Sequence, residues 1–131
     1  MDGNYEVSIL RTGHRPGRDD RITTHVGLVA RAFGADRVIF PDIASSSSST
    51  INEVSLNFGG DFKTESTTSI SKFVKSWTGS IVHLTMYGQP IDSHIDEVIE
   101  SCHSIPLLII VGAEKVPFFI KSSFFNILLS I

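Results

Sequence analysis

Residues 5–40 of the chain, YEVSILRTGHRPGRDDRITTHVGLVARAFGADRVIF, contain two predicted strands separated by a loop and a helix. Tyr5–Leu10 and Arg37–Phe40 are short and rich in apolar residues, as strands are. Arg11–Asp20 is polar and contains glycine and proline, which predicts a loop. Apolar residues then recur at helical spacing over Ile22–Phe33. A strand–helix–strand unit of this kind favours a parallel pair of strands.

The same alternation continues along the chain, so we expect one α/β domain over residues 1–131. Its sheet is expected to be mostly parallel, with helices on both faces. Ser45–Ser49 is the one low-complexity stretch and predicts a flexible surface loop. The other expected elements are helices at Ile51–Phe58, Ser69–Trp77 and Ile91–Glu100, an edge strand at Asp61–Glu65, and strands at Ser80–Thr85, Leu107–Val111 (central) and Phe124–Leu129.

Composition narrows the class of protein. Hydrophobic residues make up 41% of the 131 residues and charged residues 19%, which excludes wholesale disorder. Cys102 is the only cysteine, so neither a disulfide framework nor a cysteine-rich metal site is predicted. His14 and His25 lack a third ligand at recognisable spacing, and no metal is expected. The longest apolar run is too short for a membrane helix, and no secretory leader follows Met1. We therefore expect a soluble, cytoplasmic protein that does not contact membranes.

The net charge of -3 is unevenly distributed. All six arginines lie within residues 1–40, where five acidic residues leave a balance of +1, while residues 41–131 carry -4. A protein that coats long nucleic acid would be more basic. A compact arginine cluster that binds a few phosphates remains compatible with this composition, because planar guanidinium groups suit phosphate.

In an open parallel sheet, ligands bind beyond the carboxyl ends of the strands. Three predicted loops follow strands at this edge: Arg11–Arg21, Thr85–Pro90 and Gly112–Pro117. No glycine-rich dinucleotide motif and no P-loop motif is present. The small residues that open the third loop would let backbone groups contact a flat ligand directly.

In the first loop, Arg21 and His25 are one helical turn apart and predicted to share a face, with Arg18 close by. The start of a helix suits anions. An alternative of equal weight is that Asp19 and Asp20 pair with these arginines on a solvated surface. The other side of the helix is expected to be buried through Ile22, Val26 and Val29.

Four segments carry a resemblance to a known family. They are LRTGHRPGRDDRITTHVGLVARAFGAD (Leu10–Asp36), GGDFK (Gly59–Lys63), VHLTMYG (Val82–Gly88) and VGAEKVP (Val111–Pro117). In order and spacing these resemble the archaeal tRNA (cytidine(56)-2′-O)-methyltransferases of the SPOUT superfamily, over residues 5–117. The resemblance implies a trefoil-knotted α/β fold, a homodimer, S-adenosylmethionine as methyl donor, and tRNA as the partner, with the 2′-hydroxyl of a T-loop cytidine as the acceptor.

The resemblance also implies roles for particular residues. Arg21 would lie near the 2′-hydroxyl and its phosphate, with His25 as a supporting or alternative base. The tRNA backbone would be bound by Arg11, Arg15 and Arg18. The methyl donor would be bound by Leu84, Gly112, Ala113, Glu114, Lys115 and Val116. For Glu114 and Lys115, a simple surface ion pair is the alternative.

The sequence departs from the family pattern at its end. The family's third donor loop and final knotted helix would follow Phe125–Leu129, where only two residues remain. From this we expect an incomplete knot, weak donor binding and impaired dimerisation. The alternative function is a catalytically inactive remnant that still binds tRNA, and a generic phosphate-ligand enzyme is less favoured by the motifs.

Overall fold

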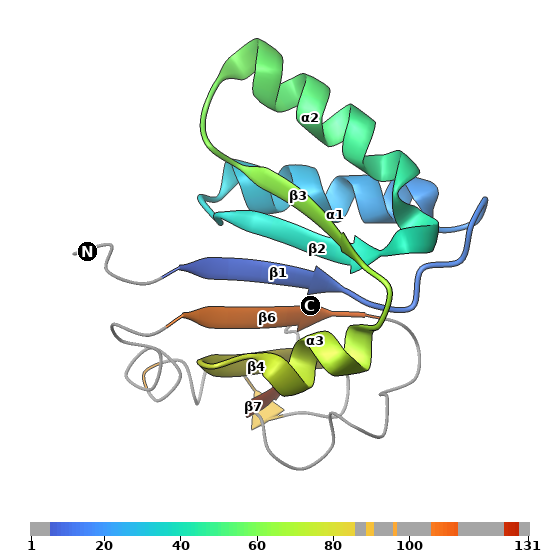
Figure 1. The fold of residues 1–131 in the computed structure, drawn as a ribbon. Helices are drawn as coiled ribbons and strands as arrows, with labels where there is room; N and C mark the ends of the chain where they lie inside the picture. Colours follow the sequence, from blue (N-terminus) through green and yellow to red (C-terminus); the bar gives the residue numbers. More distant parts are fainter. Residues whose placement is uncertain (1–5, 86–88, 91–95, 97–105, 113–124, 129–131) are drawn as a thin grey trace.

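The computed structural model of the chain describes residues 6–85, 89–90, 96, 106–112 and 125–128. Strands and helices alternate along it (Figure 1). The elements are β1 (Val7–Arg11), α1 (Asp20–Ala32), β2 (Arg37–Pro41), the 3-10 turn η1 (Asp42–Ala44), α2 (Ser46–Phe58), β3 (Lys63–Thr67), α3 (Ile70–Ser76), β4 (Ser80–Thr85), β5 (Gln89–Pro90), β6 (Leu107–Val111) and β7 (Phe125–Leu128).

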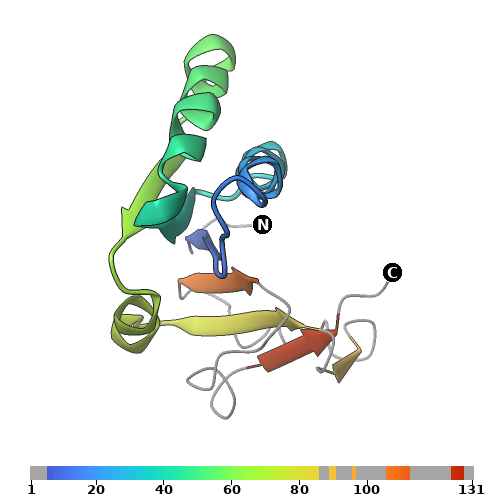
Figure 2. The ribbon, with the colours of Figure 1, turned by 90° about the vertical axis from the view of Figure 1, so that its right-hand side faces the viewer.

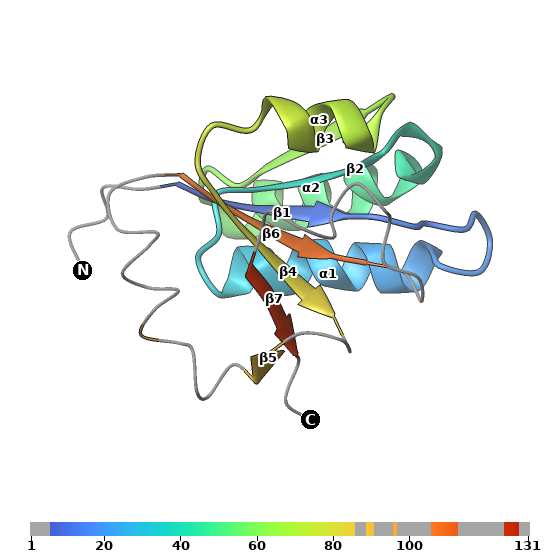
Figure 3. The ribbon, with the colours of Figure 1, turned by 90° about the horizontal axis from the view of Figure 1, so that it is seen from below.

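These strands form one sheet in the order β3-β2-β1-β6-β4-β7-β5, and every pairing among them is parallel. β6 lies between β1 and β4, as Figure 3 shows, with Ile109 opposite both Ile9 and Val82. Leu108 and Ile110 of β6 are fully buried. The predictions of a parallel sheet and of an apolar central strand are therefore confirmed.

Helices cover both faces of the sheet, as predicted (Figure 2). α1 and α2 pack on one face and α3 on the other. The connections through α1 and α2 lead from β1 to β2 and from β2 to β3, the edge strand. The connection through α3 runs in the opposite direction, past β2, β1 and β6, to β4. Right-handed crossovers that run in opposite directions place their helices on opposite faces, which explains the two layers.

Each helix layer encloses its own apolar core. Side chains alternate across a strand, so neighbours in β1 supply opposite cores: Ile9 packs toward α1 and α2, while Leu10 packs toward α3. Val38 and Ile39 divide in the same way in β2. Full burial of one such side chain stabilises the fold by about 1.5–3 kcal/mol relative to leaving it exposed.

The buried face of α1 differs from the prediction. Ile22 is 52% exposed and Val29 39% exposed, and Val26 is only half-buried. The residues that α1 buries are Thr23, Gly27 and Ala30. The reason is close packing: a Cβ at Gly27 would overlap the side chain of Ile51 in α2, so the helix approaches its neighbours through small residues.

The serine run also differs from the predicted flexible loop. Ser46–Ser49 form the first turn of α2, which begins five residues before the predicted start. The Ser48 and Ser49 hydroxyls donate to the carbonyls of Ser45 and Ser46, over 2.7 and 3.1 Å. Serine hydroxyls often bind nearby backbone in this way, and here that bonding is compatible with a helix.

The remaining boundaries lie near their predictions. β4 has the predicted bounds, and β3 is the sheet's edge strand, two residues later than predicted. α3 is capped by Ser69, whose hydroxyl accepts from the Lys72 N–H, and its Val74 is buried. Apart from Asp96, the predicted helix Ile91–Glu100 lies outside the described residues. None of the described helices has the length and apolarity that a membrane crossing requires.

Candidate functional site

Three of the strands end side by side at the carboxyl edge of the sheet. Arg11 at the end of β1 is opposite Val111 of β6, and Val111 is opposite Leu84 of β4. The arginine loop, residues 12–19, and the loop that begins at Gly112 therefore start next to each other. This is the edge at which parallel sheets bind ligands.

The first contact between these two loops is made by Thr12 and Gly112. The Thr12 N–H donates to the Val111 carbonyl over 2.9 Å, which extends the β1–β6 pairing by one residue. The Thr12 hydroxyl is buried and, within the described chain, has no hydrogen-bond partner. A side chain at position 112 would overlap this hydroxyl. Thr12 was not predicted as a site residue, although a polar residue directly after a buried strand is a usable signal.

Within the arginine loop, Asp19 is buried and holds two arginines. Its carboxylate accepts from the backbone N–H and the Nε of Arg15, over 2.8 and 3.2 Å, and lies 3.9 Å from Nη2 of Arg11. Burial alone would raise the pKa of Asp19, but these hydrogen bonds and the charges of Arg15 and Arg11 lower it below its usual value. Burial lowers the pKa of Arg11 in turn, against the opposing effect of Asp19.

A second network joins the loop to α1 through Thr23. The Thr23 oxygen accepts from Nε of Arg11 over 3.3 Å and lies 2.6 Å from Nδ1 of His14. The other ring nitrogen of His14 is 3.1 Å from the Asp20 carboxylate, which can only accept. All these groups are satisfied if Nε2 of His14 carries the proton and the Thr23 hydroxyl donates to Nδ1. Thr23 was not predicted as a site residue, because its contacts with Arg11 and His14 arise only in the folded chain.

The predicted site arginines thus separate into two groups. Arg11 is only 5% exposed, and Arg15 is bound to Asp19. Arg18 and Arg21 are exposed, and in the described part of the chain no carboxylate lies within salt-bridge distance of either. Pairing with aspartate therefore accounts for Arg11 and Arg15, while Arg18 and Arg21 have no ion pair within the described residues.

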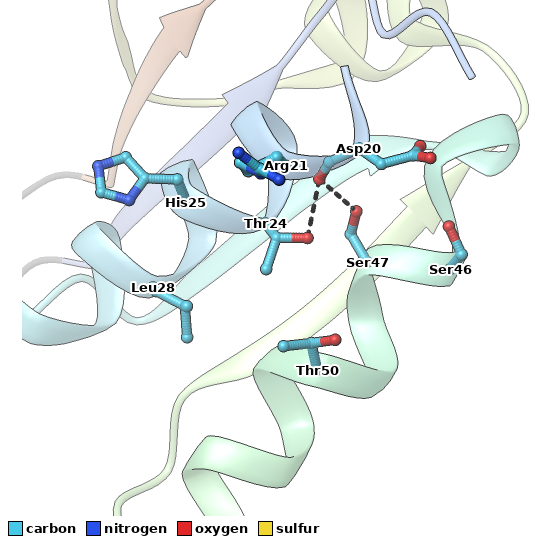
Figure 4. A pocket seen from close by; sticks show the side chains of 8 residues that line it. All are labelled: Asp20, Arg21, Thr24, His25, Leu28, Ser46, Ser47 and Thr50. Carbon is cyan, nitrogen blue, oxygen red and sulfur yellow. Dashed lines mark hydrogen bonds between the residues drawn. The ribbon is translucent and has the colours of Figure 1, made fainter. Parts of the chain in front are cut away.

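Arg21 and His25 lie together, as their spacing predicted. Both line a polar groove of about 420 Å³ between α1 and α2. Figure 4 shows them on α1, with hydroxyl side chains of α2 across the groove. The remaining lining residues are Asp20, Thr24, Leu28, Ser46, Ser47 and Thr50.

His25 also borders an apolar cavity on the other side of α1. The cavity has a volume of about 530 Å³. It is lined from the sheet by Val7, Ile9, Leu84, Ile109 and Val111, and on the other side by apolar residues of α1 and by residues 33–35. His25, predicted as a supporting or alternative base, and Leu84, predicted to bind the donor, thus line the same cavity. Gly112 is half-buried directly after Val111. The other predicted donor residues, Ala113, Glu114, Lys115 and Val116, lie outside the described residues.

The described residues contain no group of three or more side chains that could hold a metal ion. His14 is bonded at both ring nitrogens within the loop network, and its imidazole is fully buried. The described side chains can thus contribute hydrogen-bond donors, positive charge and an imidazole to a reaction.

Comparison with known proteins identifies a family and several relatives that this chain resembles. Residues 58–130 match a family model described as tRNA ribose 2′-O-methyltransferase, aTrm56. A protein of Halobacterium salinarum is 51% identical over 117 residues, which cover 89% of this chain and 61% of that protein. A protein of Natronomonas pharaonis is 55% identical over 118 residues, covering 90% of this chain and 66% of that protein. Both are named tRNA (cytidine(56)-2′-O)-methyltransferase, and the chain spans about three-fifths of the length of the first.

Proposed function

Because the chain belongs to the family of tRNA ribose 2′-O-methyltransferases, we propose that it transfers a methyl group from S-adenosylmethionine to the 2′-hydroxyl of cytidine 56 in tRNA. The observation that carries the proposal is the cavity shared by His25 and Leu84, with Arg21 one turn away on α1. The resemblance to the SPOUT superfamily extends the proposal to a cytoplasmic protein with the α/β fold of that superfamily.

The apolar cavity fits the methyl donor. Its volume of about 530 Å³ lies in the range of small-molecule sites, roughly 300–1,000 Å³, and its walls are mostly apolar, as in such sites. Leu84 and Val111 would contact the apolar parts of the adenosine, and Gly112 would offer backbone groups to its polar edge. When bound, S-adenosylmethionine supplies a methyl group activated by a sulfonium.

The acceptor side of the reaction is assigned to the α1 residues. As the 2′-oxygen forms its bond to the methyl carbon and the carbon–sulfur bond breaks, the hydroxyl proton must leave. We assign its acceptance to the imidazole of His25, because an imidazole can take up a proton near neutral pH. The Arg21 guanidinium carries hydrogen-bond donors and no acceptor, so we assign it to stabilising the negative charge that develops on oxygen.

The remaining arginines divide between binding the RNA and holding the loop. The exposure of Arg18 and the partial exposure of Arg15 support contacts to phosphates. The burial of Arg11, with its bonds to Thr23 and Asp19, supports an internal role, so we assign it to holding the loop rather than to tRNA.

A methyl-transfer assay tests the proposed function. At a donor concentration high enough to saturate weak binding, we expect the chain to label a tRNA transcript that carries cytidine 56 and to leave a transcript with 2′-deoxycytidine at that position unlabelled. Arg21→Ala should reduce transfer by at least about 100-fold, the usual effect of losing one group that stabilises developing charge. Its exposed position predicts a retained fold, which circular dichroism checks. Binding of tRNA without any transfer would favour the inactive remnant instead.

A further inference from the structure

The polar groove between α1 and α2 contains hydroxyl groups that the proposed reaction leaves without a role. We propose that this groove, lined by Arg21, Ser46 and Thr50, is a binding site for the sugar-phosphate backbone of RNA next to the reacting nucleotide. The inference rests on the proposed function, since it takes tRNA as the substrate. It gives the serine run a function beyond that of beginning a helix.

The hydroxyls around the groove fall into two sets. Thr24 and Ser47 both donate to the Asp20 carbonyl, over 2.9 and 3.5 Å, and the Ser47 bond joins α2 to α1. The hydroxyls of Ser46 and Thr50 line the groove, and within the described chain neither makes a hydrogen bond. Both residues are exposed. These two hydroxyls are therefore available to a ligand.

The hydrogen-bond donors in the groove favour a ligand rich in acceptors. The Arg21 guanidinium carries donors only and meets no carboxylate at salt-bridge distance within the described residues. Asp20 is the acidic residue of the lining, and its two carboxylate oxygens already accept from the His14 ring and from the Gly17 N–H. Phosphate and ribose oxygens match such a set of donors.

The position of the groove connects it with the reaction. Arg21 and His25 line it, and His25 also borders the cavity beside Leu84. Figure 4 shows Arg21 between His25 and Ser46, so an RNA backbone that continues along the groove from a ribose at His25 would pass Arg21 before it reaches the α2 hydroxyls. The volume of about 420 Å³ is in the range of small-ligand sites, which suits one backbone unit.

The test adds a negative charge to the groove and measures tRNA binding. Ser46→Asp is the main variant, since an acidic residue in the first turn of a helix is compatible with folding. We expect the affinity for a tRNA transcript to fall about tenfold or more, the loss of one contact to a charged group. The slope of log affinity against log salt should become shallower by about one. Thr50→Val, which removes only a hydroxyl, should weaken binding about 2- to 10-fold.

Asn57→Asp is the matched control, because it adds the same charge to an exposed position near the other end of α2. It lies eleven residues from Ser46, about 16 Å along the helix and beyond the Debye length of roughly 8–10 Å. Equal affinities of Ser46→Asp and Asn57→Asp for tRNA would overturn the proposed groove. If the wild-type chain transfers no methyl group but Ser46→Asp still weakens binding selectively, the groove is supported and the proposed function fails alone.

Discussion

Two acidic residues that follow one another in the sequence, Asp19 and Asp20, have different partners in the folded chain. Asp19 is buried and binds Arg15 and Arg11. Asp20 is exposed and binds His14 and the Gly17 N–H. The loop that carries their partners contains Gly13 and Gly17, whose positive φ angles of 72° and 78° glycine adopts without strain. Asp19 therefore fixes the loop from within, and Asp20 joins it to α1.

The lowered pKa of Asp19 predicts how this residue contributes to stability at different pH values. A carboxyl with a lowered pKa in the folded state stabilises the fold above its unfolded-state pKa, about 3.9, and that contribution is lost as the pH falls through the folded value. We expect Asp19→Asn to be less stable than the wild type at pH 7, with a difference that shrinks below about pH 4. Denaturant unfolding at several pH values measures it. A difference that stays constant with pH would contradict the assignment.

At the scale of the elements, α1 packs through small residues, and this gives a direct test. In Gly27→Ala the new methyl group overlaps Ile51, a fully buried residue of α2. We expect a net loss of about 1–2 kcal/mol in the free energy of unfolding, despite the better helix propensity of alanine. Ile51→Val removes the methyl group at the end of that side chain, so adding Gly27→Ala to it should cost less. Chemical denaturation of the four chains gives the coupling energy, and additive effects would refute the contact.

The ends of β1 and β6 provide a second double-mutant test. Gly112→Ala should cost about 1–3 kcal/mol, because the added methyl group overlaps the Thr12 hydroxyl. Thr12→Ala removes that hydroxyl and leaves the Thr12 Cβ 3.5 Å from the new one, an ordinary contact. We therefore expect Thr12→Ala to rescue Gly112→Ala in thermal unfolding. Failure of the rescue would mean that position 112 needs glycine for another reason.

The strands could be predicted from sequence, whereas the contacts of α1 could not. Leu107–Val111 is apolar throughout, and such a run indicates a buried central strand of a parallel sheet. Ile22 and Val29 have the same apolar character but remain largely exposed, because the close approach at Gly27 sets which face of α1 is buried. The spacing of apolar residues predicts the buried face of a helix from those residues alone, and glycine does not enter that prediction. Ser46 could not be predicted as a groove residue, because the composition of the serine run indicates a loop and not a helix.

At the scale of the whole molecule, the candidate site combines short-range and long-range parts of the sequence. Arg21 and His25 could be identified together because four residues separate them on one helix. Their proximity to Leu84 depends on β4 lying two strands away from β1, across β6. That strand order follows from the return of the chain through α3 and has no local signal in the sequence. The resemblance to a family, rather than periodicity, identified Leu84 as a site residue.

The distribution of charge over the whole molecule leads to the last prediction. The chain carries a net charge of -3, so attraction to tRNA cannot come from an overall positive field and must come from a local cluster. Arg18 is exposed at the carboxyl edge of the sheet, and Lys75 is exposed on α3, which packs on the opposite face from α1. Arg18→Ala and Lys75→Ala change the net charge equally.

If phosphate contacts at the loop dominate binding, Arg18→Ala should weaken tRNA affinity and reduce the salt slope by about 0.7–0.9, because one fewer counterion is released. Lys75→Ala should leave the slope unchanged, since a charge farther than about 10 Å from the RNA is screened. Arg15→Ala should have an effect in the same direction as Arg18→Ala and also loosen the loop, because Arg15 binds Asp19. Affinities measured between about 50 and 200 mM salt give the slopes. Equal slopes for the Arg18 and Lys75 variants would mean that net charge, rather than the arginine loop, governs the binding of tRNA.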